Sequence, residues 1–228
     1  MKKNPHFAIV LSGCGRADGS EIHESTCAML AIDCLNSTYQ CFAPDIKQAM
    51  VVNHITGQRV DEHRNVLEES ARIARGNIKS LKEYNPDDFD AIVFPGGIGA
   101  VINWCDFSVS GVSCQVETSV RKAIWDSYKK GLPIGAMCIA PVLIAKVLGS
   151  EGVKVTIGND EKVAASIVKT GAVHENKEAV EVCVDEIHKV ATTPAYMLAQ
   201  SIKEVCEGAD NMIKALIKLM YVLLNLQI

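Results

Sequence analysis

One cysteine of this chain, Cys138, lies where a buried strand is expected to turn sharply into a helix. The apolar run 132–137 predicts the strand, and Pro141 predicts the first turn of a helix near 141–148. A thiol at such an elbow faces the positive end of the helix dipole, which favours the thiolate. The pattern predicts a nucleophile, and the alternative is a small buried apolar residue at a strand end.

A second strand, near 90–94, ends in a Pro-Gly-Gly turn. Parallel strands deliver their loops to one edge of a sheet, so this turn is expected near Cys138. The amides of Gly96 and Gly97, together with that of Ile139, would then form an oxyanion hole and bind substrate. In the alternative, the glycines only supply a positive φ.

The first strand, near 7–12, leads through a glycine-rich loop into a helix near 20–36, for which Ser20 is the expected N-cap. Glu21 and Glu24 follow in the first turn. Glu24 is a candidate for proton transfer at Cys138, and the alternative is that both acids complement the helix dipole. His23 points about 100° away from Glu24 around the helix and is expected to act from a second shell or to lie at the surface.

The elements that position these residues alternate along the chain. Strands are expected near 7–12, 38–42, 90–94, 132–137 and 154–158, and helices near 20–36, 64–76, 114–130, 141–148 and 196–223, with a late hairpin at 180–184 and 187–191. The alternation predicts an α/β fold, a flavodoxin-like doubly wound, mostly parallel sheet with helices on both faces and a nucleophile elbow. No linker divides the chain, so one domain over 1–228 is expected, with 47–64 as a loop near the site.

Several segments together are similar to a known family: Ser12–Gly15, Asp18–Glu24, Cys41–Asp45, Asn53–Gly57, Met137–Pro141 and Thr192–Gln200. The chain resembles the ThiJ/PfpI group of the class I glutamine-amidotransferase-like superfamily, and within it the ElbB family of isoprenoid-biosynthesis proteins. The resemblance implies Cys138 as nucleophile, Glu24 as the carboxyl group that hydrogen-bonds it, and Gly96 with Gly97 as the oxyanion loop.

The resemblance also implies a cysteine-dependent, glyoxalase-like or deglycase-like action on small reactive carbonyls. The alternatives are a redox sensor based on oxidation of Cys138 and a non-catalytic partner protein. PfpI-type hydrolases carry a histidine after the nucleophile, where this chain has Ile139, and glutamine amidotransferases carry a late His-x-Glu pair, where this chain has Pro194–Tyr196. The sequence therefore predicts that the protein is not a glutaminase and leaves the general base open.

Composition and charge limit the classes of molecule that this chain is expected to bind. The chain has 228 residues, 48% hydrophobic and 22% charged, with a net charge of −4 and dispersed basic residues, so a small-molecule substrate is expected rather than nucleic acid. The glycines after the first strand are spaced G-x-G-x-x-x-G, which does not fit a dinucleotide cofactor. The nine cysteines include no Cys-x-x-Cys pair, which predicts no metal site and a reducing compartment. Cys138 is expected to be the thiol that is alkylated fastest, because only it combines a helix N-terminus with a ligand-facing edge of the sheet.

The two ends of the chain are informative about the cellular compartment and about contact with a membrane. Lys2 and Lys3 precede an apolar run of only five residues, which is too short for a signal peptide and predicts the cytoplasm. The apolar segment 212–224 carries two lysines and is too short to span a membrane. It is expected to pack on the core or on a second copy of the chain, and a homodimer is predicted.

Overall fold

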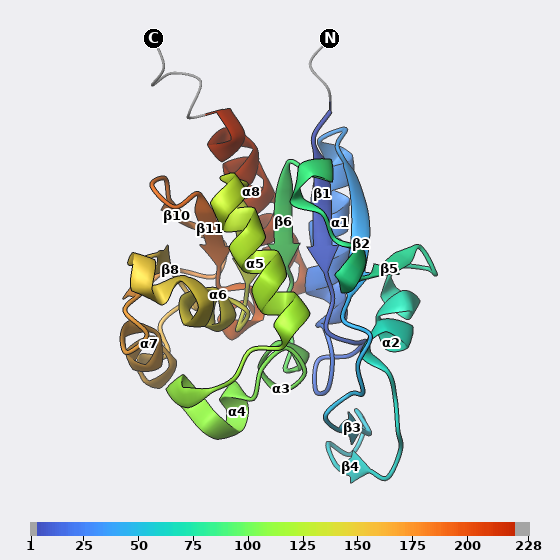
Figure 1. Ribbon diagram of the computed structural model, residues 1–228. Helices are drawn as coiled ribbons and strands as arrows, with labels where there is room; N and C mark the ends of the chain where they lie inside the picture. Colours follow the sequence, from blue (N-terminus) through green and yellow to red (C-terminus); the bar gives the residue numbers. More distant parts are fainter. Residues whose placement is uncertain (1–3, 222–228) are drawn as a thin grey trace.

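The computed structural model describes residues 4–221, and its centre is a seven-stranded sheet in the order β10-β11-β7-β6-β1-β2-β5 (Figure 1). The strands of this sheet are β1 (His6–Val10), β2 (Thr38–Ala43), β5 (Ile78–Ser80), β6 (Ala91–Phe94), β7 (Ile134–Met137), β10 (Cys183–Asp185) and β11 (Val190–Thr193). All neighbouring strands pair in parallel except β10 and β11. The flavodoxin-like α/β fold, with its mostly parallel sheet, is confirmed.

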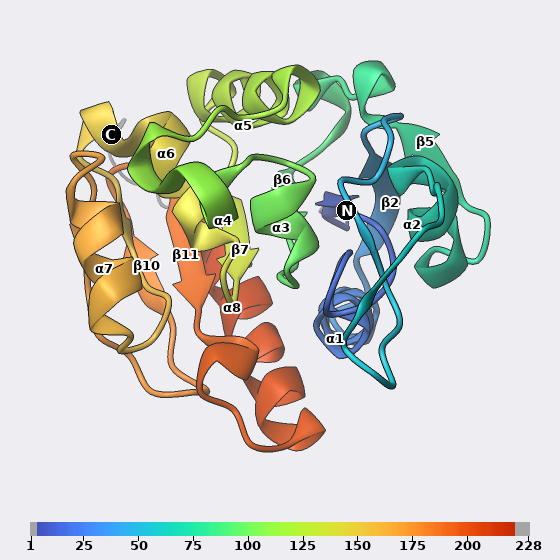
Figure 2. The ribbon, with the colours of Figure 1, turned by 90° about the horizontal axis from the view of Figure 1, so that it is seen from below.

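The helices flank both faces of this sheet (Figure 2). They are α1 (Ile22–Cys34), α2 (Val66–Ile73), α3 (Gly99–Ile102), α4 (Phe107–Ser110), α5 (Thr118–Lys130), α6 (Pro141–Leu148), α7 (Glu161–Val168) and α8 (Ile202–Tyr221). Short 3-10 turns lie at η1 (Leu81–Glu83), η2 (Pro86–Asp88), η3 (Gly111–Ser113), η4 (Gly149–Glu151) and η5 (Ala195–Met197). Helices α1 and α8 lie on one face, and α5 and α6 lie on the other.

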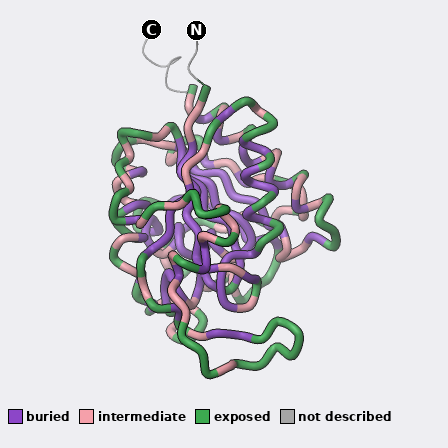
Figure 3. The backbone as a smooth tube through the Cα atoms, turned by 90° about the vertical axis from the view of Figure 1, so that its right-hand side faces the viewer, coloured by how far each residue is buried: buried purple, intermediate pink, exposed green. Residues whose placement is uncertain are grey.

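Successive side chains of each strand point to opposite faces of the sheet and so contribute to two hydrophobic cores. In β1, Phe7 and Ile9 pack beneath α1 and α8, whereas Ala8 and Val10 join the core under α5 and α6. All four side chains are fully buried, and the strands form the buried centre of Figure 3. A strand buried on both faces reads as a continuous apolar run, which is why these strands were predictable.

The predicted helix start at Pro141 is confirmed, and the end of α5 also follows from its residue type. Helix α6 begins at Pro141, which lacks an N–H to satisfy, and α5 ends at Gly131 in the left-handed conformation with a φ of 74°. The helix predicted over 196–223 is divided into η5 and α8. Residues 222–224 of the apolar segment lie outside the described residues. The buried face of α8 packs on α1, β7 and β11, as expected for packing on the core.

Two strand pairs stand outside the central sheet. The strand expected near 154–158 is β8 (Lys154–Val155), and it pairs with β9 (Val173–His174). The segment 47–64, expected as a loop, contains the hairpin of β3 (Val51–Val52) and β4 (Arg59–Val60). This largely exposed hairpin projects at the bottom of Figures 1 and 3, beyond the carboxyl ends of the parallel strands.

Candidate functional site

Cys138 occupies the turn between β7 and α6, as predicted. Its φ is 58°, a left-handed conformation that residues other than glycine seldom adopt. The backbone N–H of Cys138 donates to the carbonyl oxygen of Thr193 at 3.0 Å, which ties the turn to the end of β11. Backbone strain of this kind costs about 1–3 kcal/mol and gathers at functional sites.

Glu24 lies beside Cys138, although the two residues are far apart in the sequence. Its side chain is fully buried and hydrogen-bonds the Cys138 thiol. The N–H of Gly96 donates to Oε2 at 2.9 Å, and the N–H of Tyr196 donates to Oε1 at 3.2 Å. Backbone amides therefore hold both oxygens of the carboxyl group, and neither donor belongs to a flexible side chain.

The environment of Glu24 suits proton transfer near neutral pH. Burial, reinforced by the nearby charge of Glu21, raises its pKa to about 7, while the hydrogen bonds from Tyr196, Cys138 and Gly96 act in the opposite direction. A group whose pKa lies near the operating pH can both accept and return a proton.

The Cys138 thiol differs from the expectation of a readily formed thiolate. The residue is only 8% exposed, and burial raises its pKa well above the ordinary value, with a further rise from the charge of Glu24. The amides of Gly97 and Ile139 act in the opposite direction, as donors to the sulfur. Loss of hydration outweighs these donors, so the resting group is the thiol.

The expected oxyanion hole needs one correction. The Gly96 amide donates to Glu24, so it does not face an oxyanion. Gly97 and Ile139 remain the candidate donors because their amides face the sulfur. A Cβ at Gly96 would overlap Cys138 and Glu24, and a Cβ at Gly97, which has a φ of 99°, would overlap the backbone of Gly19 and Glu21. Both positions require glycine for close approach.

The start of α1 also differs in detail from the prediction. The N-cap is Glu21, whose Oε2 accepts from the N–H of Glu24 at 2.7 Å. The expected cap, Ser20, instead accepts from the N–H of Ser12 through its Oγ at 2.8 Å. Ser20 thus forms a hydrogen bond across the loop after β1, and Glu21 caps the helix in its place.

Tyr196 is the site residue that sequence reasoning missed. Its N–H holds Glu24, and its hydroxyl lies 2.8 Å from Nδ1 of His23. His23 is exposed and contacts Glu24's partner Tyr196, so a role for this histidine at the site stays a prediction. Ala195, directly before Tyr196, has a φ of 44°, the second strained residue at the site. The available signal was the segment Thr192–Gln200, which carries the family resemblance but in which no role was assigned to Tyr196.

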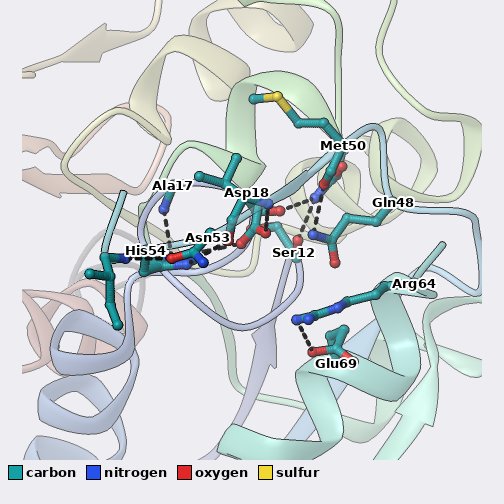
Figure 4. Close-up of polar contacts among 12 residues, drawn as sticks. Ser12, Ala17, Asp18, Gln48, Met50, Asn53, His54, Arg64 and Glu69 are labelled. Carbon is teal, nitrogen blue, oxygen red and sulfur yellow. Dashed lines mark hydrogen bonds and ion pairs between the residues drawn. The ribbon is translucent and has the colours of Figure 1, made fainter. Parts of the chain in front are cut away.

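The loop after β1 is fastened by the 47–64 segment (Figure 4). Oδ2 of the buried Asp18 accepts from the N–H of Val52 at 2.7 Å, and Nε2 of His54 accepts from the N–H of Ala17 at 3.2 Å. Asn103 donates to the carbonyl oxygens of Ser12 and Asp18 at 2.8 and 2.9 Å. The hairpin segment therefore supports the loop that carries Gly19, which packs against Gly97.

The cysteines are not all free thiols. Cys27 and Cys206 form a disulfide across 179 residues, a pairing that spacing alone does not reveal. Cys34 is exposed and Cys14 is half-buried, so both are more accessible than Cys138. Within residues 4–221, no group of three or more His, Cys, Asp or Glu side chains is arranged to hold a metal ion.

Comparison with known proteins places this site in a family. The human glutamine amidotransferase-like class 1 domain-containing protein 3, mitochondrial, is 42% identical over 93% of this chain and 82% of its own length. The crystal structure of an isoprenoid biosynthesis protein with an amidotransferase-like domain from Ehrlichia chaffeensis is 34% identical, covers 93% of this chain and 99% of its own, and has a TM-score of 0.87. The chain belongs to the ElbB-like family of the ThiJ/PfpI group.

More distant likeness supports the same fold. A ThiJ/PfpI domain protein from Brachyspira murdochii is 13% identical, covers 95% of this chain and 98% of its own, and has a TM-score of 0.60. No family model matches the chain. The human relative is named as mitochondrial, whereas the sequence predicted the cytoplasm for this ElbB-like chain. In the described part of the chain, no helix has the length and apolarity needed to cross a bilayer.

Proposed function

We propose that this ElbB-like protein is a cysteine-dependent enzyme that converts small 2-oxoaldehydes into 2-hydroxy acids, a glyoxalase-like reaction. The observation that carries the proposal is the Cys138–Glu24 pair. It places a nucleophile against a fully buried carboxyl group whose pKa is about 7, at the carboxyl edge of a parallel sheet where ligands bind.

The first step would form a bond between the Cys138 sulfur and the aldehyde carbon. The thiol proton passes to Glu24 as the bond forms, so the high pKa of the free thiol need not be overcome beforehand. The aldehyde oxygen gains negative charge and accepts from the amides of Gly97 and Ile139, and protonation of this oxygen by Glu24 completes a hemithioacetal.

The second step would move hydrogen within the substrate. Glu24, as a carboxylate, removes the proton from the former aldehyde carbon, and the electron pair shifts to the neighbouring carbonyl to give an enediolate. The negatively charged oxygen of the enediolate takes the proton of the hydroxyl group on the former aldehyde carbon. Return of a proton to the neighbouring carbon gives a 2-hydroxyacyl thioester on Cys138. Water then hydrolyses the thioester, releases the hydroxy acid and regenerates the thiol, so the net change is addition of one water to the oxoaldehyde.

The test compares methylglyoxal consumption and lactate formation in the wild type, Cys138→Ser and Glu24→Gln. Glu24→Gln keeps the shape but cannot titrate, and turnover is expected to fall by roughly 10²–10⁴, the usual contribution of a positioned acid–base group. Glu117→Gln is the control, because it makes the same chemical change at a glutamate that caps a different helix, α5. Equal turnover in the Glu24 and Glu117 variants, with both folded, would refute the proposal.

Three further proposals follow from the family, the site and the sequence. The protein should release no ammonia from glutamine, because Ile139 and Pro194–Tyr196 replace the histidine machinery of glutaminases; ammonia release that is lost in Cys138→Ser would contradict this. The Ehrlichia relative is named for isoprenoid biosynthesis, and we propose the same context here. A homodimer is also proposed from the sequence, and light scattering of the purified protein would test it.

A further inference from the structure

The Cys27–Cys206 disulfide joins the helix that carries Glu24 to the C-terminal helix. Cys27 lies in α1, three residues after Glu24, and Cys206 lies near the start of α8. Their Cα atoms are 4.8 Å apart, although 179 residues separate them in sequence. Helices α1 and α8 pack directly against each other on the same face of the sheet (Figure 2).

The same two segments are also joined at the site itself. Tyr196, in the turn η5 that precedes α8, donates its N–H to Glu24 and places its hydroxyl against His23. The disulfide and these hydrogen bonds therefore span one junction, about one helical turn apart along α1. Opening the disulfide leaves hydrogen bonds and apolar packing to hold Glu24 against Cys138.

The cross-link is accessible from one side, and the buried thiols of Cys41, Cys105 and Cys183 compete poorly for it. Cys27 is only 3% exposed, whereas Cys206 is half-buried, so a dissolved thiolate reaches the sulfur of Cys206 first. Burial raises the pKa of Cys41, Cys105 and Cys183 to about 12. These thiols are almost entirely protonated at neutral pH, which suppresses their exchange with the disulfide.

We propose that Cys27 and Cys206 form a reversible thiol–disulfide site that sets how firmly Glu24 is held against Cys138. A dithiol is the reductant: its thiolate attacks Cys206, Cys27 leaves as a thiolate and takes up a proton, and the second thiol of the reductant then releases Cys206. Two electrons pass to the protein, and the reductant ends as a disulfide. A low-molecular-weight disulfide reverses the process by the same exchange.

The first part of the test asks whether the site is reversible. Protein purified without reductant is alkylated in denaturant and mapped, and the experiment is repeated across ratios of reduced to oxidised dithiothreitol. Cys27 and Cys206 should be protected together, become labelled together on reduction, and be protected again after oxidised glutathione is added. Labelling of both cysteines in the unreduced protein, or failure of the pair to re-form, overturns the proposal.

The second part asks whether the site acts on Cys138, and it uses alkylation rather than turnover, so its result is independent of the carbonyl reaction. Reduction should change the rate of Cys138 alkylation at pH 8 at least threefold. Cys206→Ser should show the reduced rate without reductant, and Cys34→Ser, which removes an exposed free thiol from the same helix, should behave as the wild type. Rates within a factor of 1.5 between the oxidised and reduced proteins overturn the coupling.

Discussion

At the scale of single residues, the charge on Glu21 tunes the acid–base group beside it. Glu21 caps α1 and raises the pKa of Glu24. In Glu21→Gln the side-chain oxygen can still accept from the N–H of Glu24, but the charge is gone. The pKa of Glu24 should fall, so the rising limb of the pH–rate profile should move to lower pH, because the carboxylate form appears earlier.

The measurement for this variant is the pH dependence of kcat/KM with methylglyoxal between pH 5 and 9. Glu117→Gln, at the equivalent cap of α5, should leave the inflection in place. An inflection that stays near pH 7 in Glu21→Gln would mean that Glu24 is not the group that titrates.

The solvent exposure and the pKa of each thiol together change the expected order in which the cysteines are alkylated. The sequence predicted that Cys138 is alkylated fastest, but Cys138 is 8% exposed and its pKa is raised, whereas Cys34 is exposed. Brief treatment with iodoacetamide at pH 7.5 should label Cys34 before Cys138, as read by peptide mapping. Faster labelling of Cys138 would show that the protein opens its site in solution.

At the scale of elements, the turn after β6 packs closely against the loop that follows β1. Gly97 packs on the loop after β1, where a Cβ would overlap the oxygen of Gly19 and the nitrogen of Glu21. Gly97→Ala should destabilise the fold by about 1–3 kcal/mol, because strain at a positive φ adds to this overlap. It should also abolish turnover, because the turn carries a candidate oxyanion donor.

Gly57→Ala provides the matched control for this prediction. Gly57 also has a positive φ, of 71°, but an added Cβ there meets no atom within 4 Å. Only the conformational cost remains, of roughly 1 kcal/mol. Urea denaturation of both variants separates the two effects, and equal losses of stability would contradict the role given to close packing at Gly97.

The same elements show which parts of the site could be predicted from the sequence. The ends of β1, β6 and β7 were predictable because apolar runs followed by glycine or a helix start are local signals, and parallel pairing brings them to one edge. Tyr196 and the Cys27–Cys206 pair were not predictable. Both depend on the packing of α8 and its preceding turn against α1, a contact between segments far apart in sequence that no local pattern encodes.

At the scale of the whole molecule, the buried Glu24 links stability to pH. Its pKa is about 7 in the folded protein and near 4.5 in an unfolded chain, so the folded state binds more protons between these values. Stability from this group is therefore present at low pH and lost as pH rises toward 7, by about 3 kcal/mol in total. Above pH 7 its contribution to the slope vanishes.

Denaturant unfolding of the wild type and Glu24→Gln from pH 4.5 to 8 checks this linkage. The difference between their free energies of unfolding should change steadily over pH 5–7 and then level off. Subtraction cancels the surface groups that titrate in both proteins, such as Glu175, whose pKa is lowered to about 2 by Lys177 and Lys154. A constant difference over the whole range would place the pKa of Glu24 near its ordinary value.

The direction of α8 has a practical consequence for handling the protein. Strand β1 enters the sheet at the amino edge, and α8 runs back to that edge, so both described ends lie opposite the loops that carry Cys138 (Figure 1). A tether attached beyond either end would hold the molecule on a bead or sensor surface by its rear side. Solutes in the flowing liquid would then meet every immobilised molecule on the side that carries Cys138.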